Sequence, residues 1–210
     1  MPGRIRLLNG VVMMALMTAL TAGGTDIDHP SLEEIVSASD RIARVEILGY
    51  EAATFLHEGA EQHCGTVYTA HVVEPLKGGG NTFKFLAATE RDFVGTKRDY
   101  LVFALKTAGL PRPGSDDPDA PWVRCRLESA PFLLSERAQV MIPFGKDGAV
   151  APNGEWLRIA RSSAISTLPM EEAEIGGQPY GFVKWPVAKN AIMTAIAKEP
   201  RVISRVPRCH

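Results

Sequence analysis

The chain has 210 residues, in which 23 Lys and Arg are balanced by 24 Asp and Glu, for a net charge of −1. These charges form no basic stripe, and phosphate binding needs clustered Lys and Arg, so the sequence excludes nucleic acid as a partner. After the N-terminal region no apolar stretch reaches the roughly 20 residues of a membrane-spanning helix, so no stable membrane span is expected.

The N-terminal residues have the order of a secretory signal peptide. Arg4 and Arg6 precede an uncharged, mainly apolar stretch at residues 7 to 22, and small residues follow up to Gly24. The stretch is shorter than a membrane span and is typical of a cleaved signal. We therefore expect residues 1–24 to be removed and the mature protein to be periplasmic or secreted.

The first half of the mature chain predicts a helix followed by strands. Ser31 and Glu34 have the spacing of a capping box, which predicts a short helix over residues 31–38. A strand follows at 41–50, then a loop or short helix at 51–63. The alternating residues 65–76 and the segment 82–89 predict a hairpin around the turn Lys77-Gly78-Gly79-Gly80-Asn81.

The second half predicts more strands and a final helix. Residues 99–107 are densely apolar and predict a central strand, while the proline-rich segment 109–122 predicts an exposed loop. Short strands are expected within 122–134, 139–144 and 155–160, and a helix at 187–200. Short strands between turns, with helices only at the two ends, indicate a mainly β fold, either a small antiparallel barrel or a sandwich.

Three segments resemble a known family. They are DRIARVEI (40–47), CGTVYTAHVVEPLKG (64–78) and FVGTKRDYLVFA (93–104), and the similarity extends over residues 31 to 135. The pattern is similar to bacterial exported relatives of the tissue inhibitors of metalloproteinases, the netrin-like family. The resemblance implies an antiparallel OB-like barrel at 25–135 with a short N-terminal helix, and a C-terminal extension at 136–210 that packs on the barrel and ends in a helix.

The resemblance does not transfer an inhibitory site. Eukaryotic inhibitors of that family chelate the zinc of a protease with the amine and carbonyl of an N-terminal cysteine. Here removal of the signal would leave one of the residues 22 to 25 at the new terminus, and the first cysteine is Cys64. Protease inhibition is therefore an analogy at the level of the fold.

The pair His63-Cys64 has three interpretations. His57, His63, Cys64 and His71 could bind zinc or copper, but their spacing matches no common ligand pattern. Cys64 could be a nucleophile with His63 or His71 as its base, yet these side chains lie on opposite faces of a regular strand. In an exported protein a disulfide is the expected outcome, and Cys64–Cys125 is favoured over pairings with Cys209, although spacing does not determine connectivity.

Other candidate sites have simpler explanations. Ser162-Ser163 lacks the glycine frame of a hydrolase nucleophile, and Lys77-Gly78-Gly79-Gly80 lacks the frame of a phosphate-binding loop. The run Glu171, Glu172 and Glu174 is typical of a solvated face. The aromatic residues of the second half either pack at the ends of the barrel or form a binding surface. They are Trp122, Trp156, Tyr180, Phe182 and Trp185, of which the last four are the candidate binding surface.

These patterns predict an exported, non-enzymatic module that binds an exported or envelope protein, and the family resemblance adds an inhibitor-like role as one form of that binding. No catalytic residue, metal site or cofactor is predicted. The alternative is a small periplasmic hydrolase whose site the sequence does not reveal. A cleft with a buried cluster of titratable side chains would indicate the hydrolase, and an apolar interior beneath a polar surface would indicate the module.

Overall fold

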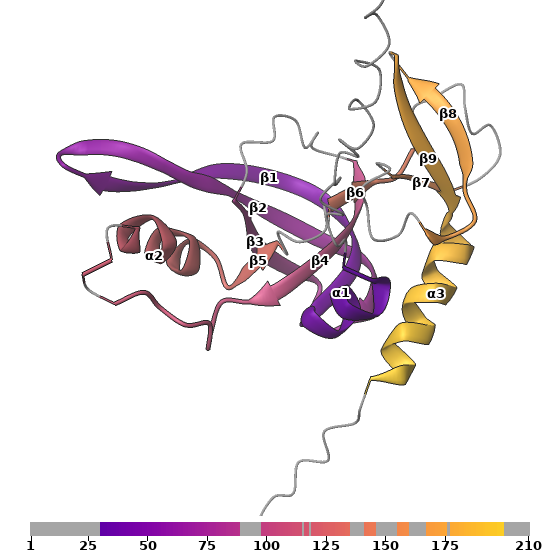
Figure 1. The fold of residues 1–210 in the computed structure, drawn as a ribbon, viewed down its shortest axis with the longest axis horizontal. Coiled ribbons are helices and arrows are strands. Elements are labelled where there is room, and N and C mark those ends of the chain that lie inside the picture. The colour runs from indigo at the N-terminus through magenta and orange to yellow at the C-terminus, as the bar shows by residue number, and fades with distance from the viewer. Residues whose placement is uncertain are drawn as a thin grey trace, which may run out of the picture.

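The computed structural model describes residues 30–88, 98–114, 116–117, 119–134, 141–145, 155–159, 167–175 and 177–199. The described chain is mainly β, with three helices, a mixed six-stranded sheet and a three-stranded antiparallel sheet (Figure 1). The elements in chain order are α1 (Leu32–Ala38), β1 (Arg41–His57), β2 (Ala60–Lys77), β3 (Thr82–Ala87), β4 (Asp99–Lys106), α2 (Ala120–Ser129), β5 (Phe132–Leu134), β6 (Met141–Pro143), β7 (Trp156–Ile159), β8 (Glu171–Ile175), β9 (Gln178–Lys184) and α3 (Trp185–Lys198).

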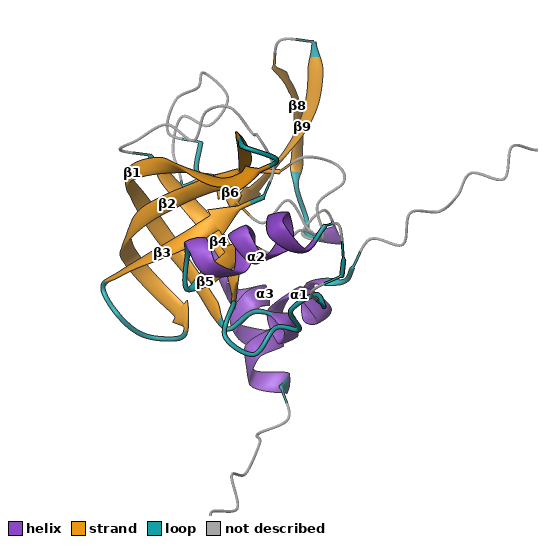
Figure 2. Cartoon of the chain, turned by 90° about the vertical axis from the view of Figure 1, so that its left-hand side faces the viewer, coloured by secondary structure: helices purple, strands orange, loops and turns teal. Residues whose placement is uncertain are grey.

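The predicted N-terminal helix is confirmed as α1, with its capping box. The Ser31 backbone N–H donates to the Glu34 carboxylate at 2.7 Å, and the Glu34 N–H donates to the Ser31 hydroxyl at 3.2 Å. These two bonds satisfy amides that have no partner inside the helix. The helix buries Leu32, Ile35 and Val36, and it lies beside α3 (Figure 2).

The hairpin of β1 and β2 is longer than the sequence predicts. Residues 51–63, expected as a loop or short helix, continue both strands to a two-residue turn at Glu58 and Gly59, whose φ angles are 51° and 81°. Two positive φ angles match the twist of the flanking strands. The prediction was wrong because Glu-Gly is not one of the usual hairpin turn pairs, and the flanking residues are of mixed polarity.

The predicted hairpin of β2 and β3 and the central strand β4 are confirmed. Tyr68 pairs with Phe85 in the β2–β3 register, and both rings lie in a core cluster with Val45 and Val102. β1 pairs with β4 as well as with β2, and β5 pairs in parallel with β3 and antiparallel with β4. The buried face of β2 carries Tyr68 and other residues two positions apart, as the alternation predicts.

Residues 120–129 form a helix, α2, where the sequence predicts the end of a loop followed by a strand; only the last part of the expected strand is confirmed, as β5. The pattern Val123, Cys125, Leu127 with charged residues between them alternates like a strand. However, a proline in the first turn favours a helix start, and the helix packs through Ala120, Cys125 and Leu127 against the sheet. Tertiary packing has overridden the alternation, and helices are therefore not confined to the two ends of the fold.

The C-terminal residues share a core with the six-stranded sheet. β6 pairs with β4 in that sheet, and one buried cluster joins α1, β1 and β4 to β7, β9 and α3. The expected strands at 139–144 and 155–160 and the C-terminal helix are confirmed as β6, β7 and α3. β8 and β9 form an antiparallel hairpin, and the run Glu171, Glu172 and Glu174, expected on a solvated face, lies on β8. Residues after 135 therefore complete the core that the first half begins.

Candidate functional site

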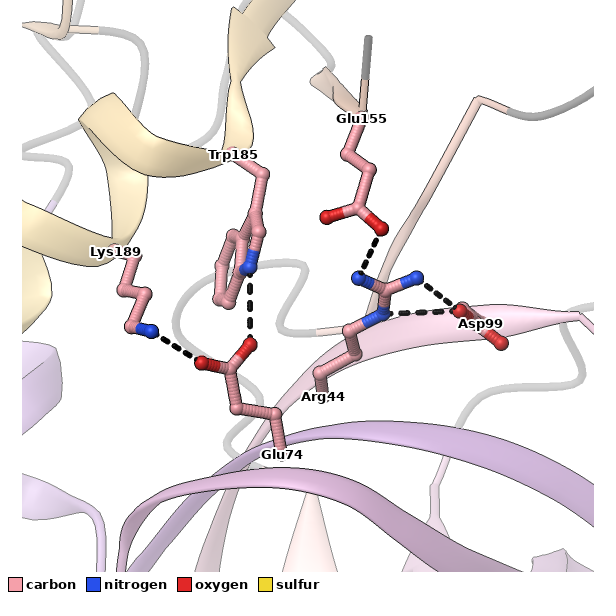
Figure 3. A network of polar contacts seen from close by, with 6 residues as sticks. All are labelled: Arg44, Glu74, Asp99, Glu155, Trp185 and Lys189. Atoms are coloured by element: carbon pink, nitrogen blue, oxygen red, sulfur yellow. Dashed lines mark hydrogen bonds and ion pairs between the residues drawn. The ribbon is translucent and has the colours of Figure 1, made fainter.

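A network of charged side chains around the buried Arg44 joins the C-terminal residues to the sheet (Figure 3). Arg44 of β1 is buried, and its Nε donates to Asp99 of β4 at 2.9 Å while its Nη1 pairs with Glu155 at 2.7 Å. The guanidinium also lies over the ring of Phe144, 4.4 Å from the ring centre. The polar contacts of the Arg44 guanidinium described here are with carboxylates of this chain, which indicates that Arg44 has a structural role.

A second set of contacts in the same region fixes α3. Glu74 of β2 accepts a hydrogen bond from the indole N–H of Trp185 at 3.1 Å, and its other oxygen pairs with Lys189 (Figure 3). Because Trp185 and Lys189 are four residues apart, they lie on one face of α3 and reach the same carboxylate. This contact holds the start of α3 on the sheet.

Glu74 is expected to make stability depend on pH in acid. Desolvation alone would raise its pKa, but hydrogen bonds from Lys189 and Trp185 outweigh this effect, so the folded-state pKa lies below the ordinary value of 4.5. The stabilisation is therefore complete above about pH 4.5 and is lost as pH falls through the lowered pKa. Between about pH 6 and pH 3, the melting temperature should fall less for Glu74→Gln than for the wild type. Glu171→Gln, at an exposed position of β8, serves as the control; equal pH slopes for all three proteins would contradict this expectation.

The distal part of the β1–β2 hairpin projects beyond the rest of the sheet, with α2 alongside it (Figure 1). We call residues 54 to 63 the hairpin arm, because in the described strands they pair only with each other. The Cys64–Cys125 disulfide joins the base of the arm to α2, with the two Cα atoms 6.2 Å apart. The predicted pairing is confirmed, although Cys125 lies in a helix and not beside a strand.

Two open depressions lie next to each other between the arm and α2, and together we call them the arm–helix groove. The first has a volume of about 380 Å³ and the second about 280 Å³, with Phe55 lining both. The first is also lined by Thr54, Leu56, Pro121, Arg124, Cys125, Glu128 and Ser129, and the second by His57, Gln62, His63, Asp119 and Trp122. The groove therefore combines apolar side chains with groups of both charges.

Apolar side chains at the groove are open to solvent. Leu56 at the arm is 76% exposed and Trp122 on α2 is 40% exposed. The Arg126 guanidinium lies 3.7 Å from the centre of the Trp122 ring, and its Nε donates to the Cys64 carbonyl at 3.2 Å. Arg126 therefore links the Trp122 ring to the backbone of β2, and this contact fixes the position of the exposed indole.

The alternatives for His63-Cys64 can now be judged. Cys64 is bonded to Cys125, so it serves neither as a metal ligand nor as a nucleophile in this structure. His57 and His63 line the groove, whereas His71 lies exposed farther along β2. Within the described residues, no group of three or more His, Cys, Asp or Glu side chains is arranged to hold a metal ion.

The candidate aromatic surface is largely internal. Trp156, Phe182 and Trp185 are buried, and Tyr180 is half-buried under Arg158. Trp185 packs edge-on against Phe144, with ring centres 5.1 Å apart. Three of the four residues therefore belong to the core, as the alternative explanation held, and do not form an exposed surface.

Sequence reasoning missed the groove because its walls come from two incorrectly predicted segments. The arm was expected to be a loop or short helix, and most of α2 was expected to be a strand. The sequence carried no clear signal for the groove, because Glu-Gly is not a usual hairpin turn pair and the exposure of Leu56 is a property of the folded chain. Among the other candidates, Glu171, Glu172 and Glu174 lie exposed on β8, and Ser162-Ser163 and Cys209 lie outside the described residues.

Two observations complete the description. In the part of the chain that the structure describes, no helix combines the length and the apolar character needed to cross a bilayer. Comparison of the chain with family models, with curated proteins and with solved structures found no match.

Proposed function

We propose that this chain is an exported binding module that engages another exported or envelope protein through the arm–helix groove. The observation that carries the proposal is the groove itself, in which Leu56 and Trp122 are exposed beside His57, His63 and Arg124. Protein interfaces are enriched in aromatic side chains and arginine, and they surround apolar anchors with polar groups. A segment of a partner that carries one apolar anchor and a polar flank suits this surface.

We further propose that β1, β2, β3, β5 and β4 form a closed OB-like barrel. The pairing of β1 with both β2 and β4 supports this, because the hydrogen-bonded neighbours β1–β2–β3–β5–β4–β1 then make a complete circuit. A closed sheet has no unpaired edges along its length, which suits a scaffold that displays a projecting arm.

Export is proposed from the N-terminal residues and is supported by the disulfide. Residues 1–24 have the order of a signal peptide, and disulfides persist mainly in oxidising compartments outside the cytosol. Mass spectrometry of the protein recovered from its producing cell should show the loss of about two dozen N-terminal residues. An intact Met1 on the recovered protein would contradict export by cleavage.

The binding role is tested with matched exposed positions. Trp122→Ser removes the anchor of the groove, and Val187→Ser is the control, because both native side chains are 40% exposed and Val187 lies on α3. A partner captured from an envelope extract and identified by mass spectrometry should bind the wild type and Val187→Ser equally. Its affinity for Trp122→Ser should be at least about tenfold lower. Equal affinity of the partner for Trp122→Ser and Val187→Ser would show that the groove is not the binding surface.

The hydrolase alternative rests on His57, His63 and Asp119, which line the second depression. A histidine near a carboxylate is a common general base. We expect the purified protein to hydrolyse simple ester and amide substrates no faster than buffer. Hydrolysis that His57→Ala or His63→Ala abolishes would favour the enzyme over the binding module.

A further inference from the structure

Two arginines on β1 are buried to the same degree but have different surroundings. Arg41 is 8% exposed and Arg44 is 7% exposed. Arg44 pairs with Asp99 and Glu155, as described above. Among the described residues, the guanidinium of Arg41 has neither a hydrogen bond nor an ion pair, and its recorded contacts are with aromatic rings.

Two aromatic rings lie on one side of the Arg41 guanidinium, 5.5 Å from each other. Its central carbon lies 4.4 Å from the ring centre of Phe83 and 5.2 Å from that of Phe132. Within the described residues, every side-chain nitrogen that is shielded from solvent has a hydrogen-bond partner. Because the Arg41 guanidinium nitrogens have no such partner, they keep contact with solvent. These unpaired N–H donors are therefore within reach of a molecule in solution.

The neighbouring turn leaves space for these donors. A Cβ atom at Gly80 would lie 3.0 Å from Nη2 of Arg41, whereas a Cβ atom at Gly79 would meet nothing within 4 Å. The nearby Asp40 carboxylate accepts a hydrogen bond from the backbone N–H of Lys106 at 2.7 Å, and it forms no ion pair with Arg41. Lys106 pairs with Phe132 in the β4–β5 register, so its position adds a second positive charge to this end of the sheet.

An unpaired guanidinium in this position is energetically unusual. Burial lowers the pKa of Arg41, whereas the hydrogen bonds and charges of Glu155 and Asp99 outweigh burial and raise the pKa of Arg44. Stacking on aromatic rings offsets part of the desolvation of a cation but leaves its in-plane donors unused. The planar fork of arginine matches two oxygens of one carboxylate or phosphate group.

From this contrast we propose that Arg41 is an anion-binding site, which takes a carboxylate or phosphate group on the donor edge beside Gly80. Phe83 and Phe132 hold the guanidinium plane in position, so the fork is oriented before a ligand arrives. The site lies at the start of β1, whereas the arm is at the other end of that strand. It is therefore separate from the arm–helix groove, and its test does not depend on the proposed partner.

The site is tested on the full chain by following the arginine Nε–Hε resonances in nitrogen-15 NMR spectra. Arg41→Lys removes one resonance and so assigns it. Sodium phosphate and sodium acetate are titrated separately, with sodium chloride at the same ionic strength as reference. The Arg41 resonance should move along a saturating curve, with half-saturation on the order of millimolar. Arg44 is the internal control and should stay unmoved, because Asp99 and Glu155 already occupy its donors.

Substitutions of Gly79 and Gly80 provide a second test of the site. Gly80→Ala crowds Nη2 and also strains the backbone, because φ at Gly80 is 99°; it should weaken the anion response at least about tenfold, while Gly79→Ala should leave it unchanged. Saturation with phosphate alone assigns a phosphate ligand, and saturation with acetate alone assigns a carboxylate; either result supports the site. An Arg41 resonance that does not move, or that moves equally in chloride, overturns it and leaves Arg41 with a packing role only.

Discussion

Replacing Cys64 or Cys125 with serine is expected to lower the free energy of unfolding by about 2–5 kcal/mol. The bond joins residues 61 positions apart, so either substitution opens the same long loop in the unfolded chain. The double variant should be little less stable than either single variant, because two changes that remove one interaction do not add. Urea unfolding, monitored by tryptophan fluorescence, measures all three.

Cys209→Ser is the matched control for this expectation. Cys64 and Cys125 are bonded to each other, so Cys209 forms no disulfide with either of them. Replacing Cys209 should therefore leave the free energy of unfolding within about 0.5 kcal/mol of the wild type. Peptide mapping without reduction checks the pairing directly. Strictly additive losses in the double variant would show that the two cysteines act independently.

Arg44→Met should destabilise the protein by about 3–5 kcal/mol, because it removes the cation of the nearly buried Arg44–Asp99 ion pair and leaves Asp99 without this partner. The Asp99 side chain is only 11% exposed and would lose both hydrogen bonds that it accepts from the Arg44 guanidinium. The substitution retains an apolar side chain against Phe144, so the loss reflects the charge more than the packing. Equilibrium unfolding in urea at neutral pH measures it.

Lys84→Met separates this effect from the general loss of an ion pair. Lys84 pairs with Glu51 at 2.8 Å, but both side chains are at least half exposed. Exposed pairs contribute at most about 1 kcal/mol, and salt screens them. If the two variants lost equal stability, the Arg44 network would be no more important than a surface pair.

The parts of the fold that the sequence predicts correctly are those where local chemistry and tertiary packing agree. Ser31 and Glu34 cap α1 with bonds that form within one turn, so no distant contact is needed to specify the helix start. The alternation of β2 survives because one face of that strand packs on the core and the other meets solvent. Local patterns of this kind are readable because each residue's preference matches its final environment.

The segments that were predicted wrongly are those where distant contacts decide the structure. Residues 122–129 alternate like a strand, but the bond from Cys125 to Cys64 and the contact of Arg126 with the Cys64 carbonyl fix them as a helix on β2. The partner of Arg44 at Glu155 lies more than one hundred residues away, and no spacing rule relates the two. Pairing of buried charges across the chain is a property of the assembled core.

Of the candidate site, the sequence predicted only the disulfide at the base of the groove. Export made a disulfide the expected outcome, and Cys64–Cys125 was favoured over the two pairings with Cys209; this bond marks the base of the groove. Trp156, Tyr180, Phe182 and Trp185 were expected either to form a binding surface or to pack in the core, because large rings near turns can be exposed as well as buried. Composition alone does not distinguish these outcomes, since the exposure of a ring depends on what the rest of the chain places over it.

The covalent link between the arm and α2 also affects how any occupant of the groove would be selected. The two walls belong to segments far apart in sequence, yet their spacing is set before an occupant arrives. Ordering of flexible loops subtracts from the affinity of many interfaces, and here that loss is largely avoided. An arm–helix groove with walls fixed in this way would select an occupant by its shape. Small changes in the shape of the occupant should therefore change mainly its dissociation rate.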